Sequence, residues 1–150
     1  MNFVLLPNKT INVKIIKAIG LKIDGKSANK INPYVTITLE QDESQIKKTR
    51  TIMSNPNPIW NEIFTFQSTK GQNAIFYFDI KSEGTGFIDK IISKKNKLSL
   101  DSIDLSKPLT IRLQDFYGIG NVGKLYVQIS FGKISQKEKP NLKTISSRAQ

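Results

Sequence analysis

The chain has 150 residues, 38% of them hydrophobic, and its 23 Lys and Arg residues outnumber 12 Asp and Glu to give a net charge of +11. That length is enough for one domain with a sizeable core and too short for two. The absence of cysteine excludes disulfides and thiol chemistry, and the absence of histidine removes the usual general base and the commonest zinc ligand, so we expect no enzyme.

The N-terminal residues 1–9 are expected to form a leader ahead of the first strand. Their apolar stretch at residues 3–6 is short, has no basic residue before it and is followed at once by Pro7, which is a poor match to a secretory signal. No run of about 18 apolar residues occurs, so no transmembrane helix is expected. We therefore expect a cytoplasmic protein whose contact with membranes is peripheral.

Beyond the leader, apolar and polar residues alternate over short runs that Gly, Pro, Asn and Asp interrupt, and helical spacing is not sustained. In chain order, the pattern predicts strands at residues 11–17, 34–40, 47–53, 62–66, 74–80, 91–100, 109–113 and 124–131. Long polar loops are expected at residues 20–31 and 81–90, and a charged turn at residues 41–45. Short strands joined by turns favour an all-β fold, here an eight-stranded antiparallel β-sandwich.

The last residues, 133–150, contain too few apolar side chains to offset the entropy of ordering them. This segment has five basic residues and one acidic residue, Glu138. We expect a flexible basic tail, either simply solvated or in contact with lipid or a partner. The predicted organisation is thus a leader at 1–9, one domain at 10–132 and the tail at 133–150.

Three sequence motifs resemble the C2 domain, the lipid-binding module named from protein kinase C. Residues 32–35 read Asn-Pro-Tyr-Val, residues 48–52 read Lys-Thr-Arg-Thr-Ile, and residues 57–66 read Asn-Pro-Ile-Trp-Asn-Glu-Ile-Phe-Thr-Phe. Each motif also has a structural reason, because prolines fix extended or turn geometry and the aromatic residues can fill a core. The resemblance covers residues 10–132 and implies a C2-like sandwich; it identifies the fold better than the activity.

The resemblance also implies a topology. In the family, the strand that reads Gly-x-Leu-x-Val is either the first or the last of the sandwich, because two topologies are related by circular permutation. Here that motif is at residues 123–127, the last strand. The chain therefore resembles the type II topology of phospholipase C and the novel kinase C enzymes.

Family members that bind calcium supply about five aspartates from two loops, because the ion needs several converging carboxylates. Here an asparagine replaces the aspartate before Pro-Tyr, and serine and glycine stand at the paired positions 82 and 84 of the other loop. We therefore expect no cofactor and largely calcium-independent behaviour. The alternative left open is a weak calcium site that uses Asp24, Asn32, Glu83 and Asp89.

The family also has a lysine-rich surface on its second and third strands that accepts phosphatidylinositol phosphates. By position, the resemblance assigns Tyr34, Lys48, Arg50 and Trp60 to this surface. Lys48 and Arg50 are two residues apart on a predicted strand, so both should project from one face of the sheet. The alternative is that they are ordinary solvated strand residues.

A second basic group is predicted at the loop end of the sandwich, where an apolar pair at the tip of the 81–90 loop could insert between headgroups or simply pack. The basic residues are Lys22, Lys26, Lys30 and Lys90, and the apolar pair is Phe87 and Ile88.

These residues predict a monomeric, peripheral membrane-binding module that docks on anionic phospholipid or phosphoinositide through basic side chains. Each such side chain is worth about 1 kcal/mol near an anionic leaflet. Two alternatives remain: a module that binds an acidic protein partner, and weak calcium-dependent phospholipid binding. Nucleic acid is not an expected partner, because neither a recognition helix nor a strand face with interleaved aromatic residues is present.

Overall fold

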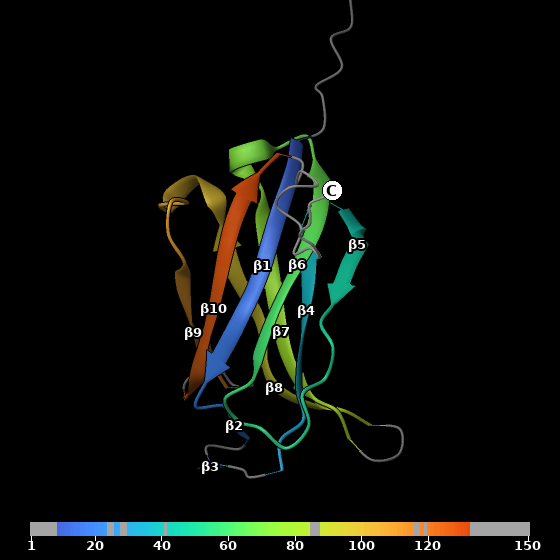
Figure 1. The fold of residues 1–150 in the computed structure, drawn as a ribbon, viewed down its shortest axis with the longest axis vertical. Coiled ribbons are helices and arrows are strands. Elements are labelled where there is room, and N and C mark those ends of the chain that lie inside the picture. Colours follow the sequence, from blue (N-terminus) through green and yellow to red (C-terminus); the bar gives the residue numbers. More distant parts are fainter. Residues whose placement is uncertain are drawn as a thin grey trace, which may run out of the picture.

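Two four-stranded antiparallel sheets pack face to face in the computed structural model, which describes residues 9–23, 26–27, 30–40, 42–84, 88–115, 118 and 120–132 (Figure 1). The first sheet has the order β6 (Ile59–Ser68), β1 (Lys9–Ile19), β10 (Asn121–Phe131) and β9 (Leu109–Gln114). The second has the order β5 (Asp42–Lys48), β4 (Pro33–Leu39), β7 (Ile75–Ser82) and β8 (Lys90–Ser99). The predicted all-β sandwich of eight strands is confirmed in these two sheets.

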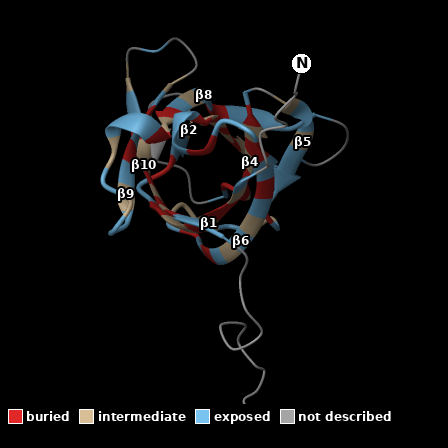
Figure 2. Ribbon diagram, turned by 90° about the horizontal axis from the view of Figure 1, so that it is seen from above, coloured by how far each residue is buried: buried red, intermediate tan, exposed pale blue. Residues whose placement is uncertain are grey.

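The core lies between the sheets, where side chains at alternate strand positions are buried. Figure 2 shows the buried positions in red along the strands of both sheets. On β1, Ile11, Val13 and Ile15 are fully buried, as the alternation predicts. Phe66 of β6 and Phe76 of β7 meet across the core with ring centroids 5.0 Å apart and planes at 70°. An edge-to-face pair of this kind stabilises the fold by about 1 kcal/mol beyond the contribution of the apolar area that it buries.

A β-bulge near the end of β1 changes which side chains face outward. The pairing of β1 with both neighbours shifts between Ile15 and Lys17, so Ala18 turns into the core while Lys17 lies opposite Tyr126 of β10. On β10, Gly123 has φ +128°, and a Cβ at this position would lie 2.9 Å from the carbonyl oxygen of Ile19. The glycine therefore lets β10 approach the end of β1 closely.

The predicted boundaries are wrong around β5. Residues 42–48, mostly assigned from sequence to a charged turn, form the strand, and residues 49–53 leave the ladder. The Asp42 carboxylate accepts hydrogen bonds from the Ser44 backbone N–H and the Gln45 side chain, which stabilises the polar run. Beyond Lys48, only irregular bonds to β4 continue, such as Thr49 N–H to the Val35 carbonyl at 2.9 Å.

The predicted polar loop at residues 20–31 contains a short hairpin, β2 (Lys22–Ile23) with β3 (Lys26–Ser27). Two single-turn 3₁₀ helices, η1 (Gly71–Asn73) and η2 (Leu100–Ser102), complete the described elements. We call "the loop end" the end of the sandwich where β1 and β7 finish and β4, β6, β8 and β10 begin, at the bottom of Figure 1. No helix among the described residues has the length and apolarity needed to cross a membrane. The predicted tail, 133–150, and residues 1–8 of the predicted leader lie outside the described residues.

Candidate functional site

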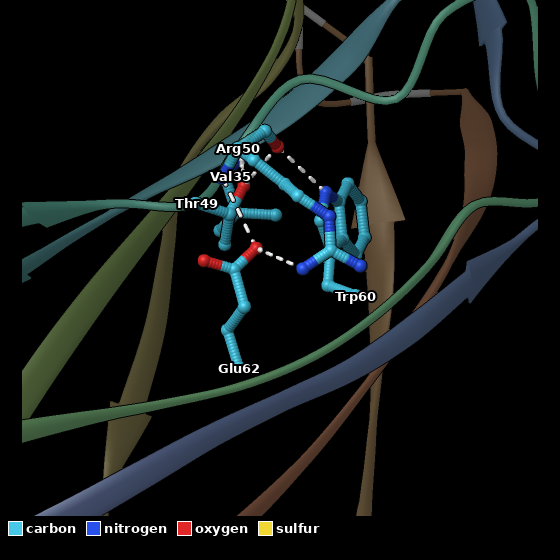
Figure 3. Close-up of polar contacts among 5 residues, drawn as sticks. All are labelled: Val35, Thr49, Arg50, Trp60 and Glu62. Carbon is cyan, nitrogen blue, oxygen red and sulfur yellow. Dashed lines mark hydrogen bonds and ion pairs between the residues drawn. The ribbon is translucent and has the colours of Figure 1, made fainter.

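Lys48 and Arg50, the predicted phosphate-binding pair, already have partners within the protein. The Lys48 ammonium lies 4.3 Å from the centroid of the Tyr34 ring. Arg50 follows the end of β5, and its guanidinium lies 3.5 Å from a carboxylate oxygen of Glu62, which also accepts the Arg50 backbone N–H at 3.1 Å (Figure 3). The Arg50 side chain is 58% exposed, so this ion pair is worth about 1 kcal/mol or less and an external anion can compete for it.

Trp60 is a core side chain. It is 1% exposed, and its indole N–H donates to the Arg50 carbonyl at 2.9 Å. The Thr49 hydroxyl donates to the same carbonyl and accepts the Val35 N–H, each at 2.9 Å (Figure 3). Trp60 therefore holds the segment after β5 against the sandwich, and this burial does not fit the lipid contact inferred for it from the sequence.

Tyr34 is also buried, at 5% exposed, and its hydroxyl donates to the Asp89 carboxylate at 2.5 Å. Burial, followed by this hydrogen bond, raises the pKa of Tyr34 to about 12. The same bond, aided by the Gly84 N–H, lowers the pKa of Asp89. The phenol thus stays neutral at pH 7, and an ionised carboxylate lies close to Lys48 in the predicted basic surface.

The titration of Tyr34 tests this bond. The difference in tyrosinate absorbance between the wild type and a Tyr34→Phe variant should report one group with pKa about 12, against about 10 for an ordinary tyrosine. Because the folded-state pKa is the higher one, the bound proton stabilises the fold below pH ~10, and that stabilisation disappears as the pH rises toward 12. An Asp89→Asn control should move the pKa back toward the ordinary value. A Tyr34 titration near pH 10 in the wild type would contradict both the burial of the phenol and its bond to Asp89.

The loop end brings together most of the second predicted group. Lys22, Lys30 and Lys90 are exposed there, and Ile88 is 78% exposed at the tip of the loop between β7 and β8. The Lys26 side chain and Phe87 lie outside the described residues. Sequence reasoning missed Met53, which is 64% exposed in the turn between β5 and β6 because the strand expected there ends early.

Asn32 connects the loops that carry these apolar side chains. Its side-chain oxygen accepts the Ser54 N–H at 2.8 Å, and its side-chain N–H donates to the Glu83 carbonyl at 3.1 Å. The Glu83 carboxylate accepts the Thr51 hydroxyl at 2.8 Å. The turn with Met53 and the loop with Ile88 are therefore held side by side.

The residues of the candidate weak metal site are thus engaged with protein groups. Both oxygens of Asp89 accept hydrogen bonds, one from Tyr34 and one from the Gly84 N–H at 3.1 Å. Among the described residues, no cluster of three or more acidic, histidine or cysteine side chains could hold a metal ion. Asp24, the fourth predicted ligand, lies outside the described residues. The arrangement of Asn32, Glu83 and Asp89 is suited to fixing the loops.

A further set of cations is brought together on the other sheet, and the sequence alone did not indicate it. Lys14 and Lys17 of β1 lie beside Gln128 and Tyr126 of β10, and Lys124 lies opposite Arg112 of β9. The sequence shows that these basic residues alternate with apolar ones and should face outward. That they lie close to one another follows only from the pairing of the first strand with the last.

Comparison with known proteins gives consistent matches. A family model described as the C2 domain matches residues 9–114. Synaptotagmin-1 of Arabidopsis thaliana is 28% identical over 145 residues, which cover 89% of this chain and 26% of that protein, so the chain spans about a quarter of the relative's length. A solved C2 domain of plant extended synaptotagmin 1 matches with a TM-score of 0.73 at 26% identity, covering 87% of this chain and 98% of that domain. Human GIVD cytosolic phospholipase A2 matches in fold, with a TM-score of 0.67 at 22% identity over 86% of this chain and 17% of that chain.

Proposed function

The chain belongs to the C2 domain family, and from this premise we propose that it is a binding module that docks on membranes containing anionic phospholipid, largely without calcium. In this proposal the loop end enters the headgroup layer. Phosphatidylserine and phosphoinositides are the lipids that basic side chains of this kind attract. Lys48 and Arg50 remain secondary contacts, available when an anion displaces the groups that they contact in the protein.

The observation that carries the proposal is the pairing of exposed apolar tips with cations at the loop end. Ile88 and Met53 are among the most exposed large hydrophobic side chains of the described residues, at 78% and 64%. Lys22, Lys30 and Lys90 are exposed at the same end of the sandwich. Apolar side chains and lysines that are exposed at the same end of a domain match a membrane interface, where the apolar side chains enter the acyl boundary and the ammonium groups stay with the phosphates.

The hydrogen bonds of the loops support calcium independence. A calcium site needs several oxygen ligands that are free to converge on the ion. Here the Asn32 amide donates to a carbonyl, which an aspartate could not do, and the carboxylate of Asp89 is satisfied by Tyr34 and Gly84. The protein's own donors thus take the role that a bridging ion would take in ordering the loops.

Vesicle sedimentation tests the proposal. We expect the protein to sediment with vesicles that contain phosphatidylserine or phosphoinositide, in the presence of a calcium chelator, and to stay in solution with neutral phosphatidylcholine vesicles. Retention should weaken as salt rises above about 0.1 M, where exposed charges are screened beyond roughly 10 Å. Absence of binding to anionic vesicles at low salt would overturn the proposal and favour an acidic protein as the ligand, whereas binding only with added calcium would overturn calcium independence.

An Asn32→Asp substitution tests the calcium argument separately. The new carboxylate cannot donate to the Glu83 carbonyl, and because this hydrogen bond is exposed to solvent the free energy of unfolding should fall by only about 0.5–1.5 kcal/mol. We expect no compensating rise in the thermal midpoint when calcium is added, because Asp89 stays bound to Tyr34. Calorimetry of the variant and the wild type, each with and without calcium, gives the comparison. A calcium-dependent rise in the variant would show that the site lacks only one charge.

A further inference from the structure

A group of positive charges that the proposed function does not yet use lies on the outer face of the first sheet. We call "the basic face" the outward cations of β1, β9 and β10, which are Lys14, Lys17, Arg112 and Lys124. They alternate with buried residues such as Val13 and Leu125, so their side chains point to solvent. Strands β1, β9 and β10 contain no Asp or Glu at all.

None of these four cations has an ion pair with an acidic residue of the part of the chain that the structure describes. Lys124 and Arg112 lie directly opposite each other on paired strands, an arrangement that is unfavourable unless an anion neutralises it. Lys17 has only an aromatic contact, 5.3 Å above the centroid of the Tyr126 ring. The positive charge of the basic face is therefore not neutralised by the described part of the protein.

A shallow hollow of about 490 Å³ joins the basic face to the loop end. Lys22, Lys124 and the Tyr126 ring line it, together with the Asn121 side of β10. Ammonium groups can hold a headgroup phosphate, and the tyrosine ring offers a surface to the rest of the headgroup. The hollow thus makes the basic face continuous with the surface that the proposed function places in the membrane.

The outer face of the second sheet differs in charge. Lysines and carboxylates occur together on this sheet: Asp79 of β7 accepts the Lys95 backbone N–H, and Glu40, next to the end of β4, accepts the Tyr77 hydroxyl. Asp89 lies beside Lys48, as described above. The basic face differs from it because β1, β9 and β10 carry no carboxylate, although the family resemblance points to the second sheet.

We propose that the basic face is a docking surface for anionic phospholipid, so that the sandwich tilts onto its first sheet and lays both this face and the loop end on one membrane. This orientation rests on the proposed function. The occupant is a lipid surface because the face is broad and flanked by exposed apolar side chains, Ile19 at 42% and Ile63 at 48%. Charge and apolar rim together match the headgroup layer of a bilayer.

A matched pair of charge variants tests the proposal. Substituting Lys14, Lys17 and Lys124 by glutamine should weaken binding to phosphatidylserine vesicles roughly a hundredfold, at roughly fivefold per lysine. The control removes three lysines from the other sheet, Lys48, Lys95 and Lys97, and should weaken binding only a few-fold. If both variants lost affinity for the vesicles equally, or if the control lost more, the proposed docking through the first sheet would be wrong.

Fluorescent labels report the orientation directly, because the chain has no cysteine and each label is unique. A label on Gln128→Cys, in β10 beside Lys14, should become shielded from an aqueous quencher when vesicles are added. A label on Thr38→Cys, on the outer side of β4, should stay accessible. The reverse pattern would overturn the inference while leaving membrane docking intact. Failure of the wild type to bind anionic vesicles would overturn both the inference and the proposed function.

Discussion

Replacing Trp60 by alanine is expected to lower the free energy of unfolding by about 3–5 kcal/mol, the cost of deleting a large buried aromatic side chain. The ring is 1% exposed, and its N–H is bonded to the Arg50 carbonyl, so the substitution removes both a core side chain and an anchor of the segment after β5. Because typical domains are stable by only about 5–15 kcal/mol, this loss removes a large share of the total stability. Urea denaturation followed by circular dichroism measures the loss; fluorescence cannot, because Trp60 is the single tryptophan of the chain.

A Trp60→Phe variant separates the structural role from lipid contact. Phenylalanine keeps most of the apolar volume and loses the donor to the Arg50 carbonyl, which still accepts the Thr49 hydroxyl. The expected destabilisation is therefore only about 1–2 kcal/mol. Vesicle binding by this variant should equal that of the wild type. A loss of lipid binding without a loss of stability would show that the indole reaches lipid, contrary to its burial.

The strands that sequence alternation located correctly are those with one buried face, such as β4 and β7. Burial of every second side chain produces the period of two that the sequence displays. β5 was misplaced because it is an edge strand, largely exposed, so its residues 42–48 carry no such period. The hairpin of β2 and β3 was missed because two-residue strands are too short to alternate, although residues 24–25 read Asp-Gly, a common hairpin turn.

The candidate site was less predictable, because its charges are set by contacts between distant segments. The sequence shows Arg50 as a free cation, and only the fold places Glu62 against it. In the same way, the sequence indicates Tyr34 as a ligand-binding residue, and only the fold shows that its hydroxyl donates a hydrogen bond to the Asp89 carboxylate. The basic face depends on the pairing of β1 with β10, from opposite ends of the chain. Local residue patterns thus identified which side chains are basic but not which of them remain unneutralised.

Substituting Met53 and Ile88 together by asparagine is expected to weaken vesicle binding by about 3 kcal/mol, roughly a hundredfold. Each side chain is largely exposed in the free protein, at 64% and 78%, so moving it into the acyl boundary removes apolar area from water. For the same reason, stability in solution should change by less than about 0.5 kcal/mol per substitution. Titration of the protein with phosphatidylserine vesicles measures the affinity, and urea denaturation checks the fold.

The matched control substitutes Ile46 and Phe131, which are 55% and 38% exposed away from the loop end, by asparagine. It removes exposed apolar area without changing charge, so it should leave affinity within a few-fold of the wild type. If the control and the loop-end variant lose affinity equally, the apolar tips do not insert. If neither loses affinity while the variant lacking Lys14, Lys17 and Lys124 does, docking is carried by charge on the first sheet alone. Insertion depends on buried apolar area, whereas binding by the basic face depends on Coulomb attraction. High salt should therefore remove the electrostatic part of the wild-type binding free energy and leave the part that Met53 and Ile88 supply.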